Sequence, residues 1–130
     1  MKTLSLTAVL FFSIVATATV AGWRPVDGMS EAEAERLTAQ AISEYLAVDE
    51  DGEVCGVDEI WGLEREKDTV PDRPGRGEIF SIVGYARGPD LGCSITRNFD
   101  CRVVFHKPPK ESQWKVEFVD CEPTSPRYDD

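Results

Sequence analysis

The chain has 130 residues, of which 24 are acidic and 14 are basic, so its formal net charge at pH 7 is −10. This charge argues against the basic surface that nucleic acids require and that anionic membranes attract, so we expect neither as a partner. The length corresponds to one domain with a modest core, which we expect to be a monomer.

The chain begins with the pattern of a secretion signal, over residues 1–21. A lysine precedes a mostly apolar run, and Thr19-Val20-Ala21 has the small-x-small form of a cleavage site. The apolar run is too short for a membrane span, which takes roughly 20 residues. We therefore expect a secreted, extracellular protein with a folded domain over residues 22–122 and a flexible tail over residues 123–130.

One amphipathic helix is predicted near the start of this domain. Ser30-Glu31-Ala32-Glu33 forms a capping box, in which the serine hydroxyl accepts the amide of the glutamate three residues later. Apolar side chains then recur at helical spacing, including Leu37, Ile42 and Tyr45. The pattern predicts a helix from about Glu31 to Ala47.

The sequence after Gly52 is typical of strands. Apolar side chains concentrate in residues 54–70, 78–87, 99–107 and 114–121. In the third segment Phe99, Cys101, Val103 and Phe105 alternate with polar residues, and in the fourth Trp114, Val116 and Phe118 are predicted to share one face. A sheet with one apolar face needs a cover. The predicted fold is therefore α+β, with one amphipathic helix packed across a four- to five-stranded antiparallel sheet.

The four cysteines favour two disulfides, each across one hairpin. Cys55 and Cys93 are equidistant from Pro74, and Cys101 and Cys121 are equidistant from Glu111; both centres lie in strong turn signals. Residues that face each other across an antiparallel pair are within disulfide range. Four cysteines allow three connectivities, however. Cys93 and Cys101 also flank a possible turn at Arg97-Asn98, which would leave Cys55 to pair with Cys121.

The chain offers little chemistry for catalysis. His106 is the only histidine, and we expect it to be a solvent-facing strand residue. A Ser-His-Asp or Cys-His enzyme would need it as the base, and disulfides would leave no cysteine nucleophile. One histidine does not make a metal cluster. We expect a protein that is not an enzyme and that uses no cofactor or metal.

Two pieces of the sequence carry a family resemblance. The first is Gly22-Trp23-Arg24-Pro25-Val26 with Ala41-Ile42-Ser43-Glu44-Tyr45 in the helix. The second runs from Cys101-Arg102-Val103-Val104-Phe105 through Pro108 to Trp114-Lys115-Val116-Glu117-Phe118-Val119-Asp120-Cys121. Together they resemble the cystatins, which are wedge-shaped inhibitors of papain-like cysteine proteases. The resemblance implies a cystatin-like fold with a disulfide across the last hairpin.

The resemblance also implies a contact surface made of the N-terminal segment and two hairpin tips. The candidate protease-contacting residues are Gly22, Trp23, Pro71, Pro74, Gly75, Pro108, Pro109 and Trp114. The family's Gln-x-Val-x-Gly loop is closest to Phe80-Ser81-Ile82-Val83-Gly84, so Phe80, Ile82 and Gly84 form an alternative first-loop motif. Hairpin symmetry instead places this string in a strand and residues 70–77 at the tip, which is the assignment that we favour.

The expected function is reversible inhibition of a papain-like cysteine protease, with the two tips and the N-terminal segment filling the active-site cleft. One alternative is a secreted binding protein of the same fold without inhibitory activity. A second alternative is a small enzyme that uses a cavity between helix and sheet; a large apolar pocket lined by paired acids would favour it.

Overall fold

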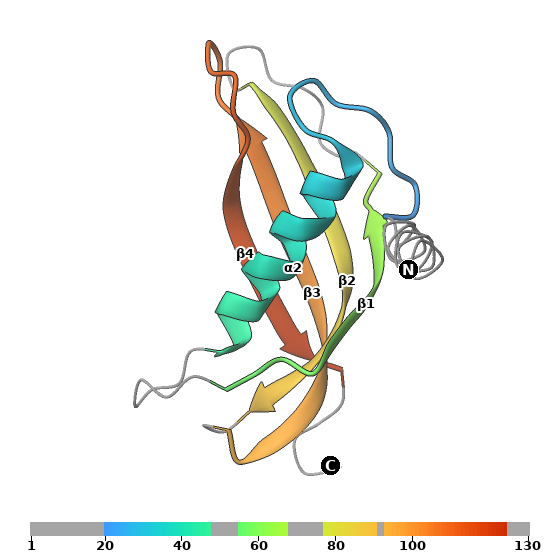
Figure 1. Ribbon diagram of the computed structural model, residues 1–130, viewed down its shortest axis with the longest axis vertical. Helices are drawn as coiled ribbons and strands as arrows, with labels where there is room; N and C mark the ends of the chain where they lie inside the picture. Colours follow the sequence, from blue (N-terminus) through green and yellow to red (C-terminus); the bar gives the residue numbers. More distant parts are fainter. Residues whose placement is uncertain (1–19, 48–54, 68–76, 91–92, 125–130) are drawn as a thin grey trace, which may run out of the picture.

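The computed structural model describes residues 20–47, 55–67, 77–90 and 93–124. The elements in chain order are α2 (Glu31–Ala47), β1 (Glu59–Arg65), β2 (Glu78–Asp90), β3 (Ile95–Lys107) and β4 (Lys115–Pro123). The four strands form one antiparallel sheet in the order β1-β2-β3-β4, and α2 crosses one of its faces (Figure 1). The predicted α+β fold is thereby confirmed, and it is the arrangement expected of a cystatin-like domain.

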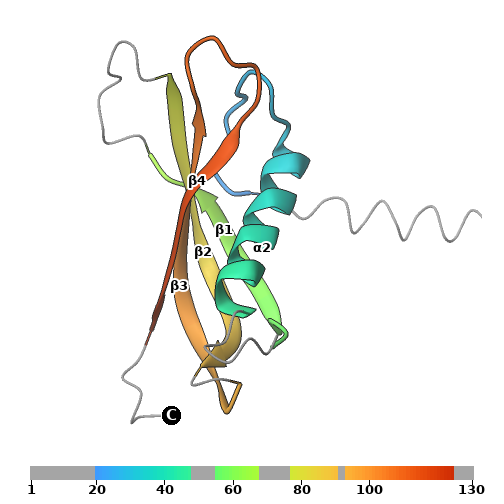
Figure 2. The same ribbon diagram turned by 90° about the vertical axis from the view of Figure 1, so that its left-hand side faces the viewer.

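The helix has the predicted bounds. Its first turn is capped by the Ser30 side chain, whose Oγ accepts the amide of Glu33 at 3.1 Å. Ala34, Thr38 and Ile42 are the buried residues of the helix. They lie on the stripe that faces the sheet, and Figure 2 shows that the helix covers only this one side. Among the described residues, no helix is long and apolar enough to cross a membrane.

The first hairpin has the predicted centre. Glu59 lies opposite Arg87 and Arg65 lies opposite Ile82, with an irregularity between Trp61 and Glu64. Residue 73 is the midpoint in sequence between Glu59 and Arg87, and it lies next to the predicted tip at Pro74. Residues 68–76 are outside the described part of the chain; β1 ends at Arg65, before the predicted tip at residues 70–77, and β2 begins at Glu78, directly after it.

A β-bulge in the last hairpin overturns one predicted strand face. Val104 lies opposite Phe118, but its neighbour Phe105 lies opposite Val116, so Glu117 is an extra residue on β4. A bulge of this kind reverses the alternation beyond it. Val116 and Phe118 were predicted to share one face; they lie on different faces, and Phe118 is 54% exposed. Phe118 therefore does not lie in the core.

Both disulfides have the favoured pairing. The structure joins Cys55 to Cys93 and Cys101 to Cys121, with Cα–Cα distances of 5.7 Å and 4.1 Å. Cys101 and Cys121 are also direct partners in the β3–β4 register. The alternative pairing of Cys93 with Cys101 is wrong, because residues 97–98 lie inside β3 and form no turn.

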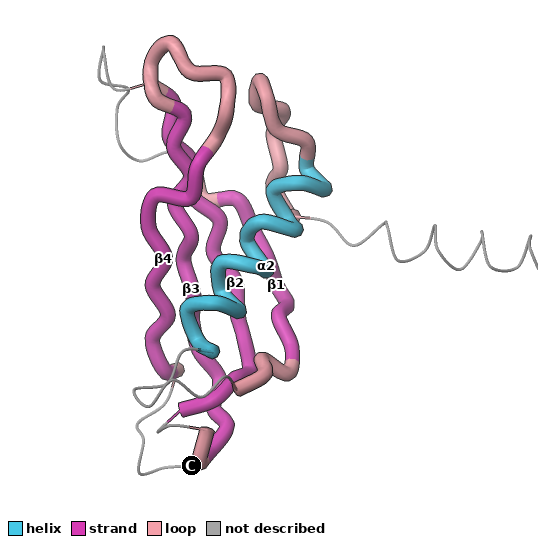
Figure 3. Tube along the Cα trace, turned by 60° about the vertical axis from the view of Figure 1, so that its left-hand side comes forward, coloured by secondary structure: helices cyan, strands magenta, loops and turns pink. Residues whose placement is uncertain are grey.

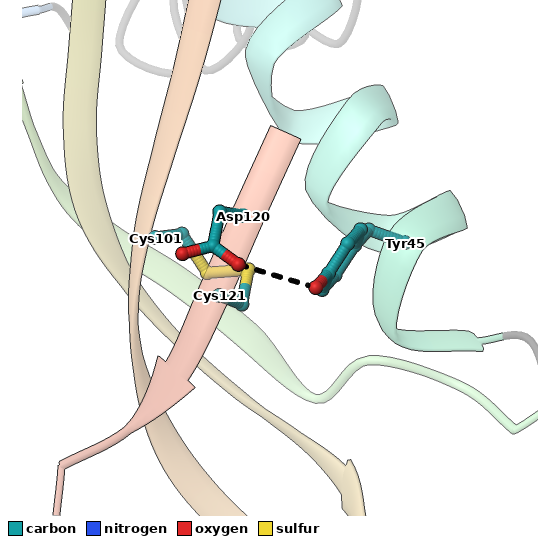
Figure 4. The surroundings of a disulfide bond; sticks show 4 residues. All are labelled: Tyr45, Cys101, Asp120 and Cys121. Carbon is teal, nitrogen blue, oxygen red and sulfur yellow. Dashed lines mark hydrogen bonds between the residues drawn. A yellow bond between two sulfur atoms is a disulfide. The ribbon is translucent and has the colours of Figure 1, made fainter. Parts of the chain in front are cut away.

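The core lies between α2 and the sheet. Its largest fully buried side chains are Phe80, Phe105, Ile42, Ile82, Val103 and Thr38. Figure 3 shows α2 lying across the strands, and its last turns approach β4. There the Tyr45 hydroxyl donates to Asp120 Oδ1 at 3.3 Å, beside the Cys101–Cys121 disulfide (Figure 4). The sheet has four of the four to five strands expected; before the helix there is only an isolated parallel bridge between Ala21 and Glu64 in the described part of the chain.

Candidate functional site

Segments that are far apart in the sequence meet at one end of the sheet. β2 begins at Glu78, which lies opposite Lys107 at the end of β3. The connections from β1 to β2 and from β3 to β4 therefore join their strands at the same end. Figures 1 and 2 show that the loop before α2 rises to this end as well, beside the β3–β4 loop. We call residues 22–29 and 108–114, together, the loop end.

The most prominent part of the loop end is a tight turn. The Glu111 amide donates to the Pro108 carbonyl at 3.1 Å, which closes a four-residue turn. Pro109 is the second residue of this turn, and Lys110 is the third, with φ at 68°. This is the geometry of a type II turn, in which proline presets the second position and glycine is usual at the third. A lysine there is strained, and such strain is characteristic of functional sites. Pro109 and Lys110 are both exposed.

The Asp27 carbonyl joins the two loops. It accepts hydrogen bonds from Trp114 Nε1 at 2.8 Å and from Lys107 Nζ at 3.3 Å. Gly28, at φ 91°, brings the first loop against the second: a Cβ there would lie 3.1 Å from the Ser112 carbonyl oxygen. The two loops therefore present one connected surface.

Lys107 connects this junction to the sheet. Its Nζ lies 2.9 Å from Glu78 Oε2 and 3.7 Å from Asp27 Oδ2, and its side chain is largely buried. The hydrogen bond that Lys107 donates to the Glu78 carboxylate raises the pKa of Lys107 above its ordinary value, against the opposing effect of burial. The charged lysine therefore pairs closely with Glu78 and, at longer range, with the exposed carboxylate of Asp27.

An aromatic cluster supports the loop end from below. Phe80 is 1% exposed and stacks on Phe105 with ring centroids 4.9 Å apart. Trp23 and Trp114 pack edge-on against the same ring, at 5.7 Å and 5.0 Å. The guanidinium carbon of Arg65 lies 4.6 Å from the centre of the Phe80 ring. One tryptophan from each loop is thus anchored on a single β2 side chain.

The predicted contact residues do not all lie at the surface of the loop end. Pro109 is exposed and Pro108 is half-buried, while Trp23 and Trp114 are partly buried in the aromatic cluster. Gly22 is exposed but lies beside β1, where its neighbour Ala21 bridges to the strand. Pro71, Pro74 and Gly75 lie outside the described residues.

The alternative first-loop motif is not a loop. Phe80, Ile82 and Gly84 are consecutive core-facing residues of β2, and all three are buried. Gly84 lies so close to Leu63 that a Cβ there would meet the Leu63 side chain at 2.5 Å. The string is apolar because it forms the core, which confirms the strand assignment favoured by hairpin symmetry.

Sequence reasoning missed the three residues that organise this end. Asp27 acts through its backbone carbonyl, for which a sequence carries no signal. Lys107 was treated as the end of a strand, although its position opposite Glu78 follows from the hairpin register. Lys110 had a usable signal, because Pro109 before it predisposes the chain to a turn.

A groove runs between α2 and β4, away from the loop end. It has a volume of about 470 Å³ and is lined by Leu37, Gln40, Ala41, Glu44, Tyr45, Val116 and Val119. Glu44 is the single carboxylate among these lining residues. The groove therefore lacks the paired acids that the second alternative, a small enzyme, would use.

Comparison with known proteins returned no match for this chain, whether with protein families, with curated proteins or with solved structures. The cystatin resemblance therefore rests on the sequence pieces quoted above and on the shared α+β arrangement.

Proposed function

We propose that this chain is a secreted, reversible inhibitor of papain-like cysteine proteases, and that the loop end enters the active-site cleft. The observation that carries the proposal is the strained turn at residues 108–111, which projects Pro109 and Lys110 from the end where two loops are joined. A strained, exposed turn on a rigid support is typical of a binding element.

The physical argument is one of pre-organisation. Association costs several kcal/mol of lost freedom, and ordering a mobile loop adds to this cost. Proline at the second turn position and the Trp114–Asp27 hydrogen bond hold the β3–β4 loop in one shape before any partner binds. Backbone and apolar contacts then suffice for inhibition. The catalytic cysteine of the protease would be covered rather than acylated.

The second candidate is a secreted binding protein of the same fold without inhibitory activity. One observation favours it: Trp114 packs on the aromatic cluster and donates to Asp27, so only part of its ring is exposed to a partner. The burial of Phe80, Ile82 and Gly84 in β2 also removes the inhibitory loop sequence from the surface. A partner would then contact the same turn without entering a protease cleft.

The test is an inhibition assay with the full-length, disulfide-bonded protein and a panel of papain-like proteases. Cleavage of a small peptide substrate should slow, and the inhibition should be competitive with that substrate. If no enzyme of the panel is slowed at micromolar protein, the inhibitor proposal fails and the binding-protein candidate replaces it. Deletion of residues through Val26 is not a clean probe, because it removes Trp23 from its contact with Phe80.

A further inference from the structure

The first two described residues are part of the folded domain. Val20 is 2% exposed and belongs to the core. Its amide donates to Glu31 Oε2, in the first turn of α2, at 3.0 Å. Its carbonyl accepts the amide of Trp23 at 3.2 Å. These contacts connect the start of the domain to the helix and to the aromatic cluster.

Ala21 is held by the neighbouring strand. Its amide donates to the Leu63 carbonyl at 2.9 Å, and its carbonyl accepts the amide of Arg65 at 2.8 Å. The two bonds make a parallel bridge across from Glu64 in β1. The cleavage site predicted from the sequence lies after Ala21. A cut there would remove both this bridge and the buried Val20 side chain. The cut would leave an apolar void and two β1 backbone groups without their partners.

A second cleavage pattern lies three residues earlier. Ala16-Thr17-Ala18 has small residues at the two positions that leader peptidases read, as does Thr19-Val20-Ala21. Cleavage takes place during export, so the local sequence selects the peptide bond that is cut. Here the sequence allows two bonds, the one after Ala18 and the one after Ala21. Only the earlier cut preserves every contact of Val20 and Ala21.

We propose that the leader is removed by hydrolysis of the Ala18–Thr19 peptide bond, so that the mature protein begins at Thr19. Water adds across the bond, which leaves a carboxylate on Ala18 and an ammonium group on Thr19. The inference rests on the proposed export of the chain, but not on protease inhibition. It has a functional consequence: Gly22 is the fourth mature residue and follows a segment bound to β1, so it is not a free chain end.

The direct test is N-terminal sequencing and intact-mass measurement of the protein secreted by a cell line that expresses the full chain. The expected start is Thr19. Ala18→Tyr should abolish that start, because a large side chain blocks the position before the cut. The matched change Ala21→Tyr, at an exposed position, should preserve it. A start at Gly22 or any other processed residue overturns the assignment, and a secreted chain that retains Met1 refutes the leader itself.

A second measurement tests the structural reason. Chains that begin at Thr19 and at Gly22 are refolded with both disulfides, and their thermal midpoints are compared. The shorter chain should melt at least about 5 °C lower, since it loses a buried valine and the bridge to β1. Equal midpoints would overturn the argument. Neither readout depends on inhibition, so a failure here is distinct from a failure of the proposed function.

Discussion

Phe80→Ala is the substitution that best separates a structural role from a protease-contacting one. The ring is 1% exposed and contacts Phe105, Trp23 and Trp114. Truncation of a buried phenylalanine to alanine costs about 3–5 kcal/mol, and each favourable aromatic pair adds about 0.5–1.5 kcal/mol beyond burial. With three such pairs lost, we expect the upper part of the first range, about 4–5 kcal/mol.

This loss is large for a domain whose total stability is about 5–15 kcal/mol. It should be measured by urea unfolding with both disulfides intact, followed by tryptophan fluorescence. Phe118→Ala is the matched control: it is the same truncation on a 54% exposed strand residue, and it should cost under about 1 kcal/mol. If Phe80→Ala costs no more than Phe118→Ala, Phe80 is not the support of the loop end and the reasoning is refuted.

Three further predictions concern the fold. Non-reducing peptide mapping should join Cys101 to Cys121, and replacing both with alanine should cost about 2–4 kcal/mol in unfolding experiments; any other partner for Cys101 contradicts the register. Ile42→Ala should cost about 2–5 kcal/mol, because it opens a cavity beneath the helix, and a loss under about 1 kcal/mol would contradict its burial. Glu78 raises the pKa of Lys107, so the stabilisation from this lysine is complete below its ordinary pKa of 10.5 and is lost as pH rises through the raised value. Wild type should therefore lose more stability than Lys107→Met as the pH rises from below 10.5 through the raised pKa, and parallel losses would contradict the pairing.

The predictions that succeeded rest on local or symmetric signals. Ser30 and Glu33 predicted where the helix begins because a capping box is complete within four residues. The turn signals around Pro74 and Glu111 predicted where the two hairpins have their centres. The pairing of residues across each hairpin followed from these centres. In each case the information lies in the segment that forms the structure.

The predictions that failed depend on contacts between distant residues. A one-residue bulge at Glu117 put Phe118 on the outer face, and nothing in the alternating pattern of that strand marks the insertion. The candidate contact residues Trp23 and Trp114 remain partly exposed, and the sequence does not show that both of them also pack on Phe80 from distant parts of the chain. Tertiary packing decides where these indole rings lie, and the alternation of apolar and polar residues along a strand does not encode it.

The central claim is that the loop end occupies a protease cleft. The most direct test compares the inhibition constants of two variants. Pro109→Glu places a charge on the exposed turn of the loop end, whereas Ser94→Glu places the same charge on the exposed β2–β3 turn at the opposite end of the sheet. For a papain-like protease inhibited by the wild type, Pro109→Glu should raise the inhibition constant at least about tenfold, which corresponds to about 1.4 kcal/mol. Ser94→Glu should leave the constant within about twofold of the wild type. Equal constants for the two variants, or a larger effect at Ser94, would contradict the claim.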